Sequence, residues 1–278
     1  MDYLDAVILG IVEGLTEFLP ISSTGHLTIA EKVLDLPVDD PAVTGFTAVI
    51  QMGAIAAVIL YFARDIWSIA RTWVLGLAKP EYRGHRDFRM GWYVIVGTIP
   101  VGIAGLLFKD VITDELRSLW VVAFALIGWS AVMWAAERVA TQDRSEKRLN
   151  LTDAIVVGLV QCFSLIPGVS RSGATISAGL FRGLDRVTAT RLSFFLGIPA
   201  LTAAGLLEAV SYRDEITASL GWTATAVGTA VSFVVAYAAI AWLLRFVVRH
   251  SIVTFVWYRV ILGALLVAGL MIGWLSAT

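Results

Sequence analysis

The sequence predicts an all-α polytopic membrane protein, built as an inverted-topology repeat with two re-entrant broken-helix hairpins and about six full transmembrane helices. Of its 278 residues 58% are hydrophobic and only 15% are charged, against roughly 25% charged residues in soluble domains. Residues 42–63 and 216–244 contain no Asp, Glu, Lys or Arg. About 20 apolar residues in a helix cover about 30 Å, the thickness of a hydrocarbon core. The chain is therefore expected to cross a membrane several times.

Apolar segments occur throughout the chain, so we expect one integral membrane domain over residues 1–278. The net charge of −1 and the pI near 6.3 argue against nucleic acid as a partner. The single cysteine, Cys162, excludes an intramolecular disulfide and a cysteine metal cluster. The predicted apolar segments are 4–19, 43–63, 90–108, 118–136, 153–166, 170–181, 192–210, 222–244 and 251–275.

Positive charge in the connecting segments predicts the orientation, because cytoplasmic loops retain Lys and Arg. The predicted loop 64–89 carries Lys or Arg at six positions, and 137–152 and 182–191 are also rich in these residues. The segments 31–42, 109–117 and 211–221 are mixed or acidic. We expect the first group to be cytoplasmic and the second external, with both termini external.

This assignment requires two stretches to enter the membrane and return on the same side. Residues 153–181 lie between two predicted cytoplasmic loops, and residues 4–30 lie between two predicted external segments. Each stretch is interrupted by proline and glycine, at 20–25 and at 167–173. A broken helix at membrane depth is tolerated only where it lines a protein-enclosed or wet cavity. Both stretches are therefore predicted to be re-entrant hairpins.

The two hairpins also resemble each other in sequence. Residues 5–13 read DAVILGIVE and residues 153–161 read DAIVVGLVQ. Pro20 to Ser23 then matches Pro167 to Ser170 after a slip of one residue.

An odd number of spans separates the copies, so the second is inverted relative to the first. The predicted repeats cover about 1–137 and about 150–278. Inverted repeats with broken helices place a polar site near the midplane, between the copies.

Two acids lie in the first hairpin, where an ionisable side chain costs about 3 kcal/mol and usually marks a site. Glu13 and Glu17 are four residues apart, so both project from one helix face. The structural alternative is that the two acids pair with lysine or arginine and brace the helix bundle. Two acids on one turn repel each other unless a cation lies between them, and that cation would be Arg171, a divalent metal or both.

Hydroxyls and a histidine follow the first break. Ser22, Ser23 and Thr24 can cap the second half-helix, and we expect one of them to do only that. His26 has no other histidine near it in the sequence, so a histidine-rich metal site is unsupported. Beside acids and hydroxyls, His26 is better interpreted as a general acid, general base or nucleophile.

The second break has the residues of a phosphate-binding site. Arg171 opens a half-helix, where a bidentate guanidinium and the positive helix end would both bind phosphate. Ser170, Ser172 and Thr175 supply hydroxyls beside it. Gln51 is the only amide in its apolar segment and is a further candidate for phosphate binding.

These residues resemble the paired signatures of the bacterial undecaprenyl-diphosphate phosphatases, the bacitracin-resistance family. The similar segments are EGLTEFLPISSTGH at 13–26 and PGVSRSGAT at 167–175. Shorter similarities at 50–53 and at Tyr258-Arg259 extend the resemblance over essentially the whole chain. We expect Arg259, deep in apolar sequence, to be either structural or functional.

The resemblance implies hydrolysis of undecaprenyl diphosphate to undecaprenyl phosphate and inorganic phosphate. This reaction recycles the lipid carrier of peptidoglycan synthesis and confers bacitracin resistance. The resemblance also implies a bacterial inner-membrane location, an active site open to the external face and a divalent cation, Mg²⁺ or Ca²⁺. The family's site residues fall on Glu13, Glu17, Ser23, His26, Ser170, Arg171, Ser172 and Thr175.

Several alternatives stay open at this point. The nucleophile is Ser23 or His26, and Glu17 is either the base or, with Glu13, a metal ligand. Arg171 would stabilise the phosphoryl oxygens. The competing function is a polyprenyl-phosphate transporter or flippase, because inverted repeats with broken helices also build transporters. A homodimer is the default expectation for oligomeric state.

Overall fold

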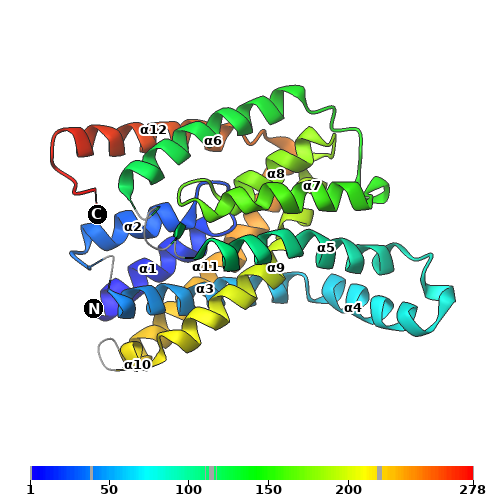
Figure 1. The fold of residues 1–278 in the computed structure, drawn as a ribbon, viewed down its shortest axis with the longest axis horizontal. Coiled ribbons are helices and arrows are strands. Elements are labelled where there is room, and N and C mark those ends of the chain that lie inside the picture. Colours follow the sequence, from blue (N-terminus) through cyan, green and yellow to red (C-terminus); the bar gives the residue numbers. More distant parts are fainter. Residues whose placement is uncertain are drawn as a thin grey trace.

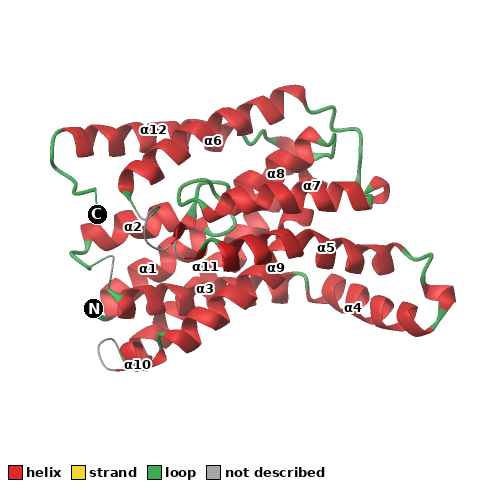
Figure 2. Ribbon diagram, in the orientation of Figure 1, coloured by secondary structure: helices red, strands yellow, loops and turns green. Residues whose placement is uncertain are grey.

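Every regular element in the described part of the chain is helical (Figure 2), apart from one isolated β-bridge between Arg144 and Leu184. The computed structural model describes residues 2–37, 40–109, 111–112, 116, 118–217 and 221–277. The α-helices are α1 Tyr3–Thr16, α2 Ser23–Val33, α3 Pro41–Tyr61, α4 Ala63–Ala78, α5 Arg86–Leu107, α6 Leu119–Val139, α7 Leu151–Gln161, α8 Arg171–Phe181, α9 Arg186–Ser211, α10 Arg213–Glu215, α11 Trp222–Arg249 and α12 Val253–Met271. Short 3₁₀ helices cover η1 Pro80–Tyr82, η3 Glu146–Arg148 and η4 Cys162–Leu165.

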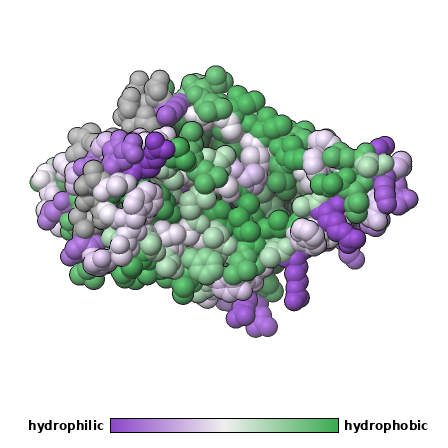
Figure 3. All heavy atoms as spheres, turned by 90° about the horizontal axis from the view of Figure 1, so that it is seen from below, coloured by the Kyte–Doolittle hydropathy of each residue, from purple (hydrophilic) through white to green (hydrophobic). Residues whose placement is uncertain are grey.

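Six of the described helices are long and apolar enough to cross a membrane: α3, α5, α6, α9, α11 and α12. Their most apolar windows have a mean hydropathy between 1.6 and 2.1. In the space-filling view, apolar side chains cover much of the middle of the visible face, and hydrophilic side chains gather most densely toward its two ends (Figure 3). The predicted all-helical class and number of full spans are confirmed.

The predicted cytoplasmic loop over 64–89 was wrong in its first half, because residues 63–78 form α4. Ile66 and Ile69 pack on the central core, and Trp73 and Gly76 contact α5. These residues recur three and four positions apart, which is the spacing of one helix face. Two of the arginines that predicted a loop, Arg64 and Arg71, lie on this helix instead.

Two pairs of short helices are interrupted near the centre of the molecule. In Figure 1, α1 begins and α2 ends at the same end of the molecule at which α12 ends, whereas α7 begins and α8 ends toward the opposite end. The interruptions, 17–22 and 162–170, lie between these ends. Both pairs therefore direct their broken segments toward the middle of the bundle.

The first helix of each pair starts in the same way. Asp2 caps α1 in a capping box with Asp5, and Asn150 caps α7 in a capping box with Asp153. Each reciprocal pair satisfies backbone N–H groups that the first turn of a helix leaves open. The sequence match between 5–13 and 153–161 thus coincides with a match in local structure.

Glycines let both of these helices approach a long helix closely. A Cβ at Gly10 of α1 would strike the backbone of Gly228 in α11, and a Cβ at Gly158 of α7 would strike the backbone of Gly97 in α5. Close backbone approach through small residues is the usual means of packing helices in membranes. These contacts fix the depth of the two interruptions against the spanning helices.

An arginine network fixes the end of the α7–α8 pair that lies away from its interruption. Arg144 and Arg182 both donate to the buried Asp153 carboxylate, at 2.6 and 2.9 Å in the two ion pairs. The hydrogen bond to Asp153 raises the pKa of the Arg144 guanidinium above its usual value. The backbone N–H of Arg144 also donates to Gly183, so segments 140–150 and 182–185 lie side by side.

Candidate active site

The first interruption begins at Glu17 and ends at Ser22. Glu17 is the C-cap of α1, and its backbone N–H donates to the carbonyl of Glu13 at 3.0 Å. Ser22 is the N-cap of α2, where its hydroxyl accepts from the N–H of Gly25 at 3.4 Å. Its φ of 77° lies in the left-handed region, which costs a non-glycine residue of order 1–3 kcal/mol. The capping hydroxyl expected in this segment is therefore that of Ser22.

The second interruption ends with the same geometry. Ser170 has a φ of 74°, and its hydroxyl accepts from the N–H of Gly173 at 3.1 Å. The two caps align Ser22 with Ser170, whereas the sequence match had aligned Ser23 with Ser170. The reason is that the cap, not the preceding proline, fixes the register of the half-helix. Ser23 and Arg171 are then the first residues of equivalent helices.

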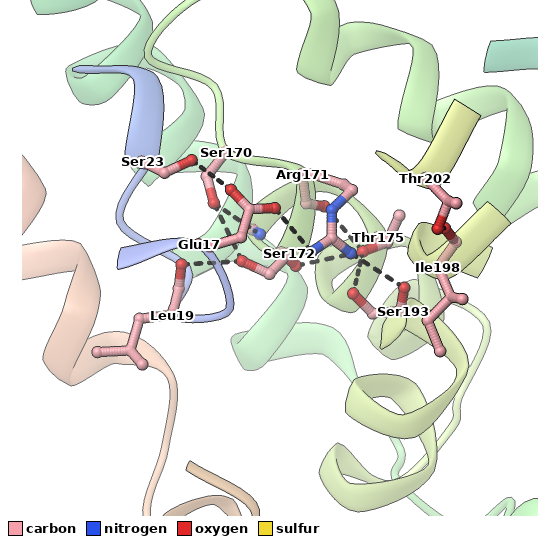
Figure 4. Close-up of polar contacts among 11 residues, drawn as sticks. Glu17, Leu19, Ser23, Ser170, Arg171, Ser172, Thr175, Ser193, Ile198 and Thr202 are labelled. Atoms are coloured by element: carbon pink, nitrogen blue, oxygen red, sulfur yellow. Dashed lines mark hydrogen bonds and ion pairs between the residues drawn. The ribbon is translucent and has the colours of Figure 1, made fainter. Parts of the chain in front are cut away.

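Glu17 joins the two interruptions (Figure 4). Its Oε2 accepts a hydrogen bond from the Ser23 hydroxyl at 2.6 Å, and its Oε1 accepts from Nη2 of Arg171 at 3.2 Å. The side chains of Glu17 and Arg171 are only 4% and 8% exposed. A carboxylate that is paired with a guanidinium on one oxygen and with a hydroxyl on the other can take the proton of that hydroxyl.

The guanidinium of Arg171 is held from several sides. Nη1 donates to the carbonyl of Ser193 at 3.2 Å, and the guanidinium lies 5.7 Å from the ring centre of Phe18. It also fills the space that a side chain at Gly197 would need. Nε is buried and has no hydrogen-bond partner among the described residues. The arrangement leaves Arg171 a free donor in a fixed position.

Glu13 is the second acid, one helical turn before Glu17. Its side chain is buried, and neither carboxylate oxygen has a hydrogen-bond partner in the described part of the chain. An unpartnered buried carboxylate is costly, and a proton or a cation would relieve the cost. The described residues contain no group of three or more His, Cys, Asp or Glu side chains that could hold a metal ion. A hard cation is nevertheless compatible with this acid pair, because Mg²⁺ is commonly held by one or two carboxylates together with substrate phosphates.

His26 lies behind Ser22, with both ring nitrogens engaged. Nδ1 is 2.6 Å from the carbonyl oxygen of Ser22, and Nε2 is 2.6 Å from the hydroxyl of Tyr258. A carbonyl only accepts, so Nδ1 carries a proton, and in the neutral ring Nε2 accepts from Tyr258. His26 therefore supports the backbone just before Ser23, and it does not contact Glu17 in this arrangement.

The three hydroxyls of the second interruption are mostly used within the protein. Ser172 donates to the carbonyl of Leu19 at 2.9 Å, and Ser170 lies 3.1 Å from the Ser172 hydroxyl. Thr175 is within 2.6 Å of the Ser193 hydroxyl. Ser172 and Thr175 are fully buried, so they brace the interruptions against each other and against α9 (Figure 4).

A cavity of 380 Å³ brings most of the predicted residues together. Glu17, Ser23, Arg171 and Gln51 line it, together with Ser170. The cavity continues from these polar groups to the apolar side chains of α5, η4 and α9. Ligand sites of this size class commonly pair a few polar groups with apolar walls.

The structure adds a lining residue that the sequence did not single out. Gln161 lines the cavity, is fully buried, and has neither amide atom hydrogen-bonded within the described part of the chain. In the sequence match it stands where the first hairpin has Glu13. That equivalence was the signal that could have found it.

Arg259, which the sequence predicts to be either structural or functional, contacts both interruptions. Its guanidinium is fully buried in α12 and donates to the carbonyls of Pro20, at 3.4 Å, and Gly168, at 2.9 Å. It also donates to the Ser130 hydroxyl at 3.1 Å. These contacts fasten both interruptions to α12 and favour a structural role for Arg259.

Comparison with known proteins gives a family assignment. The family model described as "Bacitracin resistance protein BacA" matches residues 6–265. The chain is 55% identical to "Undecaprenyl-diphosphatase 3" of Frankia casuarinae, over the full length of both proteins. It is 54% identical to "Undecaprenyl-diphosphatase" of Cutibacterium acnes, over 98% of each chain, and 50% identical to that of Mycolicibacterium smegmatis, over 100% of each. The predicted family is confirmed: the chain belongs to the BacA family of bacitracin resistance proteins.

Proposed function

We propose that this protein hydrolyses undecaprenyl diphosphate to undecaprenyl phosphate and inorganic phosphate, and so confers resistance to bacitracin. The observation that carries the proposal is the chain of contacts from Ser23 to Glu17 to Arg171 at the wall of the cavity. These three groups are a nucleophile, a base and a phosphate-binding cation within hydrogen-bonding reach of one another. Transport alone would not need a nucleophile paired with a base.

In the proposed reaction the Oγ of Ser23 attacks the terminal phosphorus, and its proton passes to Glu17. The bond to the bridging oxygen breaks, and undecaprenyl phosphate leaves with the electron pair. Arg171 binds the non-bridging oxygens, where negative charge concentrates in the transition state. Water then attacks the phosphoserine, and inorganic phosphate leaves as Ser23 regains a proton from Glu17.

His26 remains the alternative nucleophile. Its Nδ1 donates to the Ser22 carbonyl and its Nε2 contacts Tyr258, so neither nitrogen is directed at the Glu17 carboxylate. We therefore assign His26 a positioning role for the Ser22–Ser23 backbone in the arrangement described.

A divalent cation, Mg²⁺ or Ca²⁺, would be held by Glu13 and Glu17. The support for this assignment is the pair of unpartnered Glu13 oxygens one turn from Glu17. When bound, such a cation neutralises charge on the phosphate oxygens. Glu13 supplies negative charge to the site, and Arg171 supplies positive charge.

The chain is a multi-pass membrane protein, and we place α1–α2 and α7–α8 in the membrane as re-entrant hairpins of an inverted repeat. The matching caps at Ser22 and Ser170 support this, as do the opposite directions of the two pairs (Figure 1). The active site would open to the external face of the bacterial inner membrane. A homodimer stays a prediction from the sequence.

Labelling of single cysteines in a Cys162→Ser background tests the topology. A cysteine at Asp39, which lies outside the described residues, should react from the external side, and one at Lys147 should react only from the cytoplasm. Labelling of both positions from the same side would contradict the inverted repeat.

Phosphate release tests the activity. Purified protein in detergent should release inorganic phosphate from undecaprenyl diphosphate, and Ser23→Ala should not. Thr28→Ala is the matched control, since Thr28 lies further along α2 and, among the described residues, its hydroxyl bonds only to the Thr24 carbonyl. Lipid movement across vesicles without any phosphate release would instead favour the flippase.

A further inference from the structure

We infer that the apolar part of the cavity, between α5 and α9, holds the first isoprene units of the lipid chain, with Gly102 and Gly105 setting its width. The inference rests on the proposed function, because it names the subsite that the substrate's chain occupies once the diphosphate reaches Ser23. It concerns the recognition of the chain and not the chemistry at phosphorus.

One part of the cavity is lined by polar side chains and another part by apolar ones. Glu17, Ser23 and Arg171 line one part, and Val101 of α5, Leu165 of η4 and the α9 segment 199–204 line another. A prenyl diphosphate has the same order of groups, with a charged head joined directly to an apolar chain. Burial of apolar carbon contributes roughly 25 cal/mol per Å², so the apolar walls favour the chain over water.

The apolar part of the cavity is continuous with the outer surface of the helix bundle. Leu106 lines the cavity and is also 73% exposed, and the neighbouring Ile103 and Leu107 on α5 are 53% and 73% exposed. In a membrane-spanning helix these exposed apolar side chains face lipid. A volume of 380 Å³ is at the lower end for ligand pockets, so the remainder of a long chain would lie in the bilayer.

Two glycines on α5 leave this space open. Among the described residues, a Cβ at Gly102 would meet no heavy atom within 4 Å, and one at Gly105 would meet only Leu165, at 4.0 Å. They are three residues apart, so they lie on one face of the helix. Gly97 of the same helix differs, because its Cβ would strike Leu196 and the Ala154 carbonyl. Packing explains Gly97 but does not explain Gly102 and Gly105.

A larger apolar cavity of 490 Å³ lies between α3 and α11, but it is a poorer candidate for the chain. Met52, Trp222 and Phe233 are among its lining residues, and none of the predicted site residues is. A chain seated there would not be joined to a phosphate at Arg171. Of these two cavities, the one at α5 and α9 contains both kinds of wall.

The experiment fills the space with a larger side chain. Gly102→Leu and Gly105→Leu should raise the KM for undecaprenyl diphosphate about tenfold with kcat within a factor of two, because the catalytic residues are untouched. Gly102→Ala and Gly105→Ala should have smaller effects in the same direction. Melting temperatures should not fall, since leucine and alanine favour a helix more than glycine does. Gly128→Leu on α6 is the matched control, because its Cβ would also meet nothing within 4 Å and it lies outside the cavity.

An unchanged KM in both leucine variants would overturn the inference, and so would an equal rise in Gly128→Leu. If a leucine variant fails to fold, its alanine counterpart decides, since alanine adds only a Cβ to open space. Failure of the proposed function is a separate result, in which the unmodified protein releases no phosphate at all.

Discussion

The two interruptions share a backbone and differ in their side chains. Ser22 and Ser170 cap equivalent half-helices with nearly the same φ, 77° and 74°. The next residue is a hydroxyl in the first interruption, Ser23, and a guanidinium in the second, Arg171. One local fold thus presents the proposed nucleophile from one half and the proposed phosphate-binding cation from the other, and both side chains hydrogen-bond to Glu17.

The two halves also differ in a side chain that precedes each interruption. Glu13 and Gln161 stand at equivalent positions, and the side chains of both are buried and lack hydrogen-bond partners among the described residues. The carboxylate side can hold a cation, whereas the amide side is neutral. Since neither half contains the complete set of groups, the activity depends on how accurately the halves are held against each other. Arg259 does this through the carbonyls of Pro20 and Gly168.

The largest effect is expected on the first half. Ser23→Ala removes the attacking oxygen, and phosphate release should fall by about a thousandfold or more at every metal concentration. Phosphate release in detergent, with folding checked by thermal denaturation, measures this. Recovery of activity in Ser23→Ala at high metal concentration would move the nucleophile to His26 or to water.

The matching change in the second half should be somewhat smaller. Arg171→Lys keeps a positive charge near Glu17 but loses the planar fork that reaches both Glu17 and the Ser193 carbonyl. We expect kcat to fall about a hundredfold, close to the loss in Arg171→Ala. Arg138→Lys, at an exposed arginine over Trp134, is the control. Near-normal turnover by Arg171→Lys would reduce the role of Arg171 to charge balance.

A smaller effect is expected from a residue that contacts no substrate. A methyl group at Gly197 would occupy the place of the Arg171 guanidinium, so Gly197→Ala should displace it. Displacements of about 1 Å at a reacting centre cost up to about a hundredfold, and we expect a tenfold to hundredfold loss in kcat. Gly128→Ala is the control in open space. If Gly197→Ala retained full kcat, the position of the guanidinium would not limit the rate.

Much of the fold could be predicted because the membrane imposes simple rules on sequence. The uncharged stretches correspond to long helices, and the predicted interruptions at 20–25 and 167–173 overlap the observed ones at 17–22 and 162–170, although residues 23–25 and 171–173 are already helical. The sequence does not predict helix α4, because its arginines indicate a loop, whereas its apolar side chains pack on α5. Charge alone does not separate a loop from a surface helix.

The site was predictable in composition but not in arrangement. Sequence spacing could put Glu13 and Glu17 on one face, since that is a local property of a helix. It could not show that Ser22 is the cap, because the cap depends on a backbone conformation that a proline match does not fix. Nor could it show that His26 bonds to Tyr258, which is 232 residues away in the chain.

The two equivalent buried positions give the finest comparison, beginning with the acid. Glu13→Gln makes the first half resemble the second and removes one negative ligand. Activity should fall about tenfold at low Mg²⁺ or Ca²⁺ and return in part at high concentration, since a weakened site fills by mass action. The measurement is phosphate release against metal concentration. A loss that metal does not rescue would assign Glu13 to proton transfer or to structure.

The smallest effect is expected at the amide. Gln161→Leu removes two unpartnered polar atoms from a buried position, which would otherwise cost roughly 1–3 kcal/mol each. The melting temperature should therefore stay level or rise. If the amide binds the headgroup through one hydrogen bond, kcat/KM should fall about threefold to tenfold, since such a bond contributes roughly 0.5–1.5 kcal/mol.

Ser232→Ala is the matched control, because its buried hydroxyl also lacks a partner within the described residues and lies outside the cavity. That variant should gain stability without losing activity. If Gln161→Leu behaved like Ser232→Ala, the second half would contribute its arginine alone to the headgroup, whereas a fall in melting temperature would show that the amide is structural.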